Sequence, residues 1–318
     1  MKDGHTTHQI GILGGTGFVG RALCKRLCAD GHRVLVLTRN TKAHKDMVQG
    51  PEVALVEGDT ESFEFQAEHL ARCDVAINLI GILNERGHSG REFRALHAEL
   101  PRTFGRACRQ AGVKRVLHMS ALGAQSGSAP SRYLRSKGEG ANALQVELGS
   151  KVPWTIFCPS VIFGPDDSFT NRFAGLLRFM PGFFPLACPD ARFAPVYIGD
   201  VVEAFARAID REDTHRQRYQ LCGPREYSLR EVVEYLAQVS NHKRRIVGLS
   251  DGLSRIQAAI MEFLPGKPFS RDNYLSLQID STCEADSGEP GFTALGIEPV
   301  AMEKIVPQYL APGAKQAG

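Results

Sequence analysis

The 318-residue sequence lacks any apolar run long enough to cross a bilayer, which takes about 20 consecutive residues in a helix. It also lacks an excess of one charge sign, since 38 basic and 35 acidic residues leave a net charge of +3. The basic block Lys243-Arg244-Arg245 is too short to form a nucleic-acid-binding surface, so we expect no nucleic-acid partner. The start, Met1-Lys2-Asp3-Gly4-His5, has no apolar signal core. We therefore expect a cytoplasmic protein, and we leave open a contact with the inner face of the membrane.

Clustered cysteine and histidine are absent as well. The eight cysteines and ten histidines show none of the paired spacings that metal sites use, so we predict no metal ion. Cys24 and Cys28 stand four residues apart on an apolar face, and the other cysteines are scattered. This pattern is typical of reduced, cytosolic cysteines. A content of 43% hydrophobic and 23% charged residues is that of an ordinary globular protein.

What the sequence does contain is a glycine-rich turn between an apolar run and a helical pattern. Its residues are Gly14, Gly15, Thr16, Gly17, Phe18, Val19 and Gly20. In a dinucleotide-binding turn, Gly14 allows the tight turn, Gly17 lets backbone approach a pyrophosphate, and Gly20 lets the helix pack closely. The phosphates then lie at the helix N-terminus, where free N–H groups attract an anion. The alternative is a glycine-rich turn that binds nothing.

Residues at the ends of the next predicted strands indicate which dinucleotide is bound. After the second strand, an acidic residue would hold the ribose hydroxyl of NAD, but Thr38 and Arg39 stand there. A guanidinium suits a 2′-phosphate, so we predict NADP(H) in preference to NAD(H); the alternative is that Arg39 is a solvated loop cation. Asp59 follows the third strand, where it receives an adenine amino group or caps the next helix. Leu79 and Gly81 end the fourth strand at the same predicted ligand-binding edge.

Three further residues have the arrangement of a proton-transfer site. Ser120 ends the predicted strand 113–119, and Tyr133 and Lys137 share one face of a predicted helix because they are four residues apart. A lysine ammonium beside a phenol lowers the phenol pKa from about 10. Tyr133 would then exchange a proton with a hydroxyl or carbonyl while a nicotinamide exchanges hydride. Ser120 would steady the same oxygen, or would simply end the strand by bonding its own backbone.

These motifs resemble those of the short-chain dehydrogenase/reductase superfamily, in its extended, atypical branch, which includes NAD-dependent epimerases and dehydratases. The similarity covers nearly the whole chain, from the glycine turn through Tyr133 and Lys137 to the run 159–165. The resemblance implies that Pro159 and Val161 in that run border the nicotinamide. It also implies that Lys137 contacts the cofactor ribose.

A closer resemblance is to the nucleotide-binding accessory subunit of respiratory complex I and its bacterial relatives. It rests on the runs 118–124, 136–140 and 195–201. Two positions depart from the wider family. Cys158 stands where relatives often carry arginine, and Ala121-Leu122 stands where they often carry serine or threonine.

The order of elements predicts an α/β fold with a Rossmann-type, doubly wound parallel sheet and a smaller C-terminal α/β lobe. We expect an NAD(P)-binding domain at residues 8–165, to which segments at about 190–222 return. A substrate or partner lobe is expected at 166–310, and a flexible tail at 311–318. In the later part, Asp200 is expected to cap a helix, and Ser228 with Glu231 forms a predicted capping box.

Two apolar segments leave their roles open. The segment 173–188 is interrupted by Pro181 and Pro185, so it cannot be one regular helix. It walls an apolar substrate pocket, faces a membrane or partner, or closes the core between the lobes. The segment 253–264 has helical apolar spacing, which predicts a packed helix or one that lies on a membrane or partner surface.

Two functions follow from these observations. One is an NADP(H)-dependent oxidoreductase or epimerase-like enzyme that acts on a hydroxyl or carbonyl of an apolar, quinone-related small molecule. The other is a non-catalytic NADP(H)-binding accessory or assembly factor of respiratory complex I or of quinone metabolism.

Overall fold

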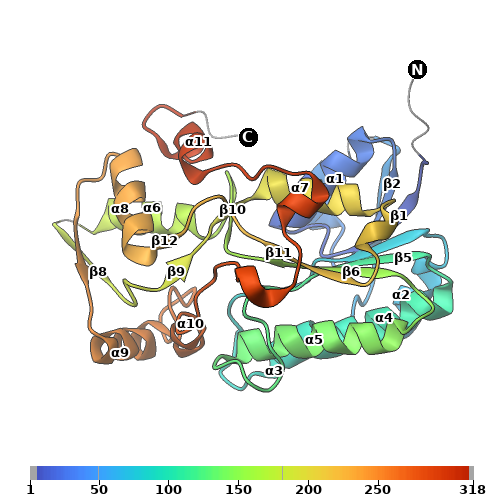
Figure 1. Ribbon diagram of the computed structural model, residues 1–318, viewed down its shortest axis with the longest axis horizontal. Helices are drawn as coiled ribbons and strands as arrows, with labels where there is room; N and C mark the ends of the chain where they lie inside the picture. The colour runs from blue at the N-terminus through green and yellow to red at the C-terminus, as the bar shows by residue number, and fades with distance from the viewer. Residues whose placement is uncertain (1–5, 49, 181, 315–318) are drawn as a thin grey trace.

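The computed structural model describes residues 6–48, 50–180 and 182–314, and a parallel sheet of seven strands forms the centre of the larger lobe, on the right of Figure 1. The strand order is β11-β6-β5-β4-β1-β2-β3. The strands are β1 (Gln9–Leu13), β2 (Arg33–Thr38), β3 (Val53–Glu57), β4 (Val75–Asn78), β5 (Arg115–Met119), β6 (Trp154–Pro159) and β11 (Gln217–Leu221). The predicted Rossmann-type fold class is confirmed. The order reverses between β1 and β4, and a doubly wound sheet binds its ligand at that point.

Helices cover both faces of this sheet, so the central strands are buried on both sides and read as nearly continuous apolar runs (Figure 1). On one face lie α1 (Phe18–Ala29) and α7 (Ile198–Ala208). On the other lie α2 (Phe63–Leu70), α4 (Leu100–Ala111) and α5 (Arg132–Leu148). A short helix α3 (Arg91–Arg94) and a π-helical turn (Ala95–Glu99) run directly into α4.

A second lobe packs beyond the carboxyl edge of the sheet, on the left of Figure 1. Its helices are α6 (Thr170–Phe179), α8 (Leu229–Val239), α9 (Asp251–Met261), α10 (Arg271–Ser276), α11 (Met302–Ile305) and α12 (Pro307–Leu310). Its strands form three pairs: β8 (Phe183–Leu186) with β13 (Arg245–Gly248), β9 (Arg192–Phe193) with β12 (Tyr227–Ser228), and β7 (Ile162–Phe163) with β10 (Val196–Tyr197). The capping box of Ser228 and Glu231 is confirmed at the start of α8.

The segment 173–188 is broken as predicted, because α6 ends at Phe179 and β8 begins at Phe183. Pro181, one of its two interruptions, lies outside the described residues, as do Met1 to His5 and residues 315–318 of the predicted tail. None of the helices in the described ranges is both long and apolar enough to cross a bilayer.

The structure corrects two expectations and decides a third point. Cys222 and Cys283 form a disulfide across 61 residues, so the prediction of reduced cysteines is wrong for this pair. Asp200 does not cap α7, whose N-cap is Tyr197; its carboxylate instead accepts a hydrogen bond of 2.7 Å from the backbone N–H of Val300. The predicted apolar helix within 253–264 exists as α9, and its large apolar side chains are exposed, which excludes the packed arrangement of the two that the sequence left open.

Candidate active site

The glycine turn connects the end of β1 to α1 at the point where the strand order reverses. Gly14 has φ +78°, a conformation that glycine adopts without strain. A Cβ on Gly14 would lie 2.9 Å from the backbone of Leu79 and Ile80, and a Cβ on Gly20 would lie 2.3 Å from the carbonyl oxygen of Gly14. Glycine at both positions therefore lets the turn, the first turn of α1 and the end of β4 pack together.

The N-terminus of α1 is open in this turn. Gly17 is its N-cap, no side chain caps the helix, and its first turn carries no acidic residue. A Cβ on Gly17 would meet only the carbonyl oxygen of Gly14, at 3.4 Å. Free backbone N–H groups and the positive end of the helix dipole therefore face a space that a side chain at position 17 would fill. This geometry fits a dinucleotide pyrophosphate.

The other residues of the turn have structural roles beside this space. Val19 is buried in the core, and Phe18 packs against it. A Cβ on Gly15 would lie 2.8 Å from Val36 of β2. The carbonyl oxygen of Thr16 accepts a hydrogen bond of 3.1 Å from Nε of Arg21. Contacts to α1 and β2 thus hold the turn in place.

The end of β2 places Thr38 and Arg39 at the edge of the same site. Thr38 is buried, whereas Arg39 is exposed. Pairing of β2 with β3 brings Glu57 beside Thr38. The carboxylate of Glu57 accepts hydrogen bonds of 2.8 and 2.7 Å from the N–H and the hydroxyl of Thr41. The sequence did not reveal this acidic neighbour, because Glu57 belongs to β3.

Asp59 lies exposed after β3 and accepts a hydrogen bond of 2.9 Å from the N–H of Glu61. The N-cap of α2 is Ser62, whose hydroxyl accepts from the N–H of Phe65 at 3.3 Å. The predicted capping role of Asp59 is therefore wrong, because the helix begins one turn later than expected.

Polar groups gather where β4 and β5 end. Asn78 and His118 are paired in register, and both are buried. Ser120 follows β5, and its buried hydroxyl has no hydrogen-bond partner among the described residues, so it does not bond its own backbone. The backbone N–H of Leu79 donates to the carbonyl oxygen of Leu13 at 2.9 Å. Leu79 thereby connects this edge to the glycine turn.

Lys137 lies buried at this edge. Its Nζ donates a hydrogen bond of 2.6 Å to the carbonyl oxygen of Met119, directly before Ser120. Burial lowers the pKa of Lys137 to about 8. A Cβ on Gly81 would lie 3.8 Å from this Nζ, so Gly81 leaves room beside the ammonium group. Pro159 ends β6 nearby, where its carbonyl oxygen accepts from the N–H of Leu122 at 3.1 Å.

Tyr133 lies in the first turn of α5, and the second lobe fixes its position. Ser131 caps the helix, and the Asp272 carboxylate accepts from the backbone N–H groups of Arg132 at 2.7 Å and Tyr133 at 3.1 Å. Burial, and after it the charge of Asp272, raises the pKa of Tyr133 to about 12. The predicted lowering of this pKa is wrong, because these contributions exceed any from Lys137. Tyr133 is therefore protonated at neutral pH.

His97, which the sequence did not single out, connects these groups. Its Nε2 accepts from the N–H of Ile82 at 3.0 Å, so Nδ1 carries the proton and donates to the hydroxyl of Ser136 at 3.1 Å. Ser136 in turn donates to the carbonyl oxygen of Tyr133 at 2.8 Å. Burial, followed by the charge of Lys137, holds the pKa of His97 well below its usual value, which keeps the ring neutral.

His97 belongs to the π-helical turn, a feature that is frequent at functional sites. A Cβ on Gly140 of α5 would lie 1.7 Å from the carbonyl oxygen of His97, so this turn packs on α5 only because position 140 is glycine. The imidazole also meets the ring of Tyr133 edge-on, with centroids 5.5 Å apart. No local pattern marks His97, because its partners lie on two other segments.

The second lobe adds an apolar cavity of about 260 Å³ beside Tyr133. Val161 lines it together with Tyr133, and so do residues from α6, β8, α9 and the segment before α10. Within 173–188, the lining residues are Phe173, Leu176, Phe184, Pro185, Leu186 and Ala187. This segment therefore walls an apolar pocket, which was one of its three expected roles. No cluster of three or more His, Cys, Asp or Glu side chains suited to a metal occurs in the ranges the structure describes.

The buried ammonium group of Lys137 is expected to destabilise the folded protein. At pH 7 the lysine is protonated in both the folded and the unfolded state, so the penalty for burying its charge is fully present. We expect Lys137→Met to raise the free energy of unfolding by up to about 3 kcal/mol at pH 7, less the loss of the bond to Met119. Because the folded pKa is lowered, wild-type stability rises with pH from about 8 towards the unfolded value of 10.5. Urea unfolding measures the difference in free energy of unfolding between Lys137→Met and wild type, and this difference should shrink as the pH rises from about 8 to 10.5. A difference that stays constant over this pH range would contradict the buried charge of Lys137.

Comparison with known proteins places this geometry in a family. A family model described as NAD(P)H-binding matches residues 14–173. The chain belongs to this family. It is 26% identical over 299 residues to NADH dehydrogenase (ubiquinone) 1 alpha subcomplex subunit 9, mitochondrial, of Rattus norvegicus, covering 92% of this chain and 77% of that one. The predicted resemblance to the complex I accessory subunit is confirmed.

Other relatives and solved structures extend the comparison. The chain is 28% identical over 253 residues to the ceramide reductase of Caulobacter vibrioides, covering 76% of this chain and 74% of that one. Its structure is similar to that of the Bordetella bronchiseptica enzyme WbmG in complex with NAD, with a TM-score of 0.72, 15% identity and coverage of 98% and 94%. The UDP-glucose 4-epimerase of Thermotoga maritima gives a TM-score of 0.71 at 14% identity, with coverage of 95% and 97%. At such identities, the two structures show the shared fold alone.

Proposed function

We propose that this protein is an NADP(H)-dependent oxidoreductase that reduces a carbonyl group of an apolar, lipid-like or quinone-related molecule. The observation that carries the proposal is the position of Tyr133. It lines the apolar cavity, and it lies one helical turn before Lys137, whose ammonium is at the carboxyl edge of the sheet. The ceramide reductase relative supports an apolar substrate of this kind.

The glycine turn would hold the pyrophosphate, with Thr38, Arg39 and Asp59 towards the adenosine and Leu79, Gly81, Pro159 and Val161 towards the nicotinamide. When bound, the reduced nicotinamide supplies a hydride to the carbonyl carbon. Lys137 lies buried at the edge where the cofactor ribose would bind. The cavity excludes water and binds the apolar part of the substrate.

Tyr133 would act as the proton donor. Because burial and Asp272 raise its pKa to about 12, it carries its proton at neutral pH and can give it to the carbonyl oxygen as that carbon gains hydride. The unpartnered hydroxyl of Ser120 is suited to donate a second hydrogen bond to the same oxygen. The phenolate that remains regains its proton from solvent after the product has left. The product is an alcohol.

A direct test is to follow NADPH oxidation with a panel of long-chain ketones, ketone forms of sphingoid lipids and quinones. Mass spectrometry of the nucleotide released on denaturation would identify the cofactor beforehand. Turnover of one apolar carbonyl class supports the proposal. A protein that binds the nucleotide but reduces none of the panel favours the alternative function.

That alternative is a non-catalytic NADP(H)-binding accessory factor of respiratory complex I or of quinone metabolism. The similarity to subunit 9 of the mitochondrial enzyme favours it. It would be supported if Tyr133→Phe restored respiratory NADH oxidation in a deletion strain while a variant defective in cofactor binding did not.

The predicted preference for NADPH rests on Arg39, which is exposed at the end of β2. The neighbouring carboxylate of Glu57 accepts hydrogen bonds from the N–H and hydroxyl of Thr41, so it is not directed at Arg39. We expect Arg39→Ala to weaken NADPH binding by about 1.5–3 kcal/mol and to leave NADH binding nearly unchanged. Calorimetric titration of both nucleotides measures this. Arg33→Ala, which removes an exposed arginine at the other end of β2, is the matched control. Equal affinities of wild type for the two nucleotides would refute the preference.

A further inference from the structure

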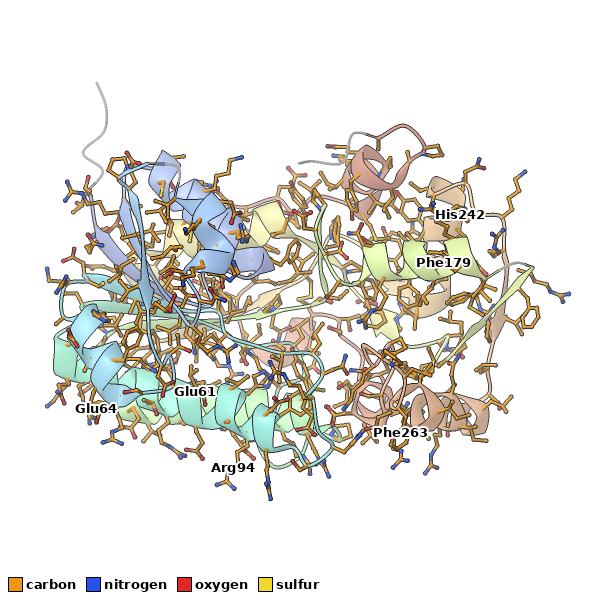
Figure 2. All side chains as sticks on the ribbon, turned by 180° about the vertical axis from the view of Figure 1, so that it is seen from behind. Glu61, Glu64, Arg94, Phe179, His242 and Phe263 are labelled. Carbon is orange, nitrogen blue, oxygen red and sulfur yellow. A yellow bond between two sulfur atoms is a disulfide. The ribbon has the colours of Figure 1, made fainter. Side chains whose placement is uncertain are left out.

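Helix α9 exposes its apolar face to solvent. Its large apolar residues, with those just after it, recur at helical spacing: Leu253, Ile256, Ile260, Phe263 and Leu264. Their exposed fractions are 52%, 56%, 62%, 70% and 47%, respectively. Figure 2 shows Phe263 at the outer edge of the second lobe, far from Glu61 and Glu64 on the opposite side of the molecule. We call these five side chains the α9 face.

The α9 face is not needed for folding, because the helix packs on its other side. Ser254 and Ala258 are its buried residues. The hydroxyl of Ser254 accepts from the N–H of Cys188 at 3.1 Å, and Gln257 donates to the carbonyl oxygen of Pro185 at 3.2 Å. The helix thus presents small and polar residues to its own lobe and large apolar residues to the outside, the reverse of an ordinary surface helix.

The segments that build the part of the lobe with α9 have an excess of basic residues. The segments 168–187 and 241–275, which build this part of the lobe, contain eight basic and three acidic residues, whereas the rest of the chain has 30 basic and 32 acidic. The three carboxylates are engaged within the protein. Asp251 binds the hydroxyl of Tyr274, Glu262 pairs with His88 and Arg271, and Asp272 caps α5. An apolar helix face in a part of the lobe with an excess of basic residues is complementary to an anionic lipid surface.

The α9 face is also continuous with the substrate cavity. Gln257 and Met261 line the cavity from the same helix, and Leu83, which is 56% exposed, lies on its rim. Asn84, the next residue, bonds the carbonyl oxygen of Lys267 through its amide at 3.4 Å. Lys267 itself donates to the carbonyl oxygens of Glu85 and Gly87 at 2.9 and 2.6 Å. These hydrogen bonds connect the rim of the cavity to the segment that follows α9.

We propose that the α9 face docks this protein on the surface of an anionic lipid bilayer, with the helix lying in the plane of the interface. The occupant of the face is the bilayer itself rather than a second copy of the chain or another protein. Docking places the rim of the cavity against the lipid, so an apolar substrate enters from the bilayer without crossing water. This last step rests on the proposed reductase function, whereas docking does not.

The test is co-sedimentation of the full chain with phosphatidylcholine vesicles that contain a quarter phosphatidylglycerol. We expect Ile260→Glu to weaken partitioning about tenfold, because it removes an apolar anchor and adds a charge that the lipid repels. The matched control is Val146→Glu, an equally simple apolar-to-acid change at a residue that is 77% exposed near the C-terminal end of α5. It should bind as wild type does. Raising the salt concentration should weaken wild-type binding, since it screens the cations.

Several outcomes would overturn docking. Wild type could remain in the supernatant, or Ile260→Glu and Val146→Glu could partition equally. A wild-type dimer that Ile260→Glu converts to monomer, without vesicle binding, would make the α9 face a contact between copies. None of these readouts needs turnover, so a failure of docking is distinct from a failure of the reductase proposal. If the protein both docks through the α9 face and acts as a reductase, Ile260→Glu should keep its activity on a detergent-dispersed substrate and lose it on the same substrate in vesicles.

Discussion

Replacing Tyr133 by phenylalanine is expected to lower NADPH-dependent turnover by about 10²-fold or more while leaving NADPH affinity nearly unchanged. The substitution keeps the ring, which packs against His97 and Phe93, and removes only the hydroxyl. The backbone N–H bond to Asp272 and the bond from Ser136 to the carbonyl oxygen of Tyr133 involve no side-chain atom of Tyr133, so the turn should stay in place. Steady-state rates with the best substrate of the panel, together with an NADPH titration, measure both quantities.

Tyr227→Phe is the matched control for this change. The hydroxyl of Tyr227 donates to the carboxylate of Glu303, and this residue of the second lobe does not line the cavity. We expect this variant to lose some stability and no turnover. If Tyr133→Phe retains full activity on a substrate that wild type reduces, Tyr133 is not the proton donor.

Replacing Gly17 by valine is expected to abolish nucleotide binding, with a loss of affinity of about 100-fold or more, and to leave the fold intact. The backbone at Gly17 has φ −79° and ψ −179°, which valine adopts without strain. A Cβ there meets only one carbonyl oxygen, at 3.4 Å, so the new side chain points into the open space at the N-terminus of α1. That space is where a pyrophosphate would need to approach the backbone.

Gly20 provides the contrast. A Cβ there would lie 2.3 Å from the carbonyl oxygen of Gly14 and 2.6 Å from the backbone of Gly15, so Gly20→Ala should lower the unfolding temperature itself. Circular dichroism and NADPH titration on the same samples separate the two effects. A folded Gly17→Val protein that binds NADPH as wild type does would show that the turn is only structural.

Structural features that depend on residues close together in the sequence could be predicted from it. The apolar runs gave the strands of the parallel sheet, because strands buried on both faces need few polar residues. The glycine spacing placed the turn between β1 and α1, and the spacing of Ser228 and Glu231 placed a capping box. Tyr133 and Lys137 lie on one helix as expected, because a separation of four residues is one helical turn.

Two helix N-caps were predicted wrongly from residue type alone. Asp59 and Asp200 both had the chemistry of a cap, but Ser62 and Tyr197 occupy those positions. A helix start depends on where the chain leaves the preceding strand, and this is set by packing as much as by the residue type.

The sequence by itself determined the class of fold, the glycine turn and the candidate proton-transfer pair, because each of these depends on residues within a few positions of one another. Only the tertiary structure decided what surrounds them. Asp272 reaches the start of α5 across 139 residues and, with burial, raises the pKa of Tyr133 rather than lowering it. His97 meets Ser136 across 39 residues, and Cys222 meets Cys283 across 61. The apolar spacing of α9 is the same whether its face is packed or exposed, so burial had to be read from the folded chain, where small residues fill its inner side.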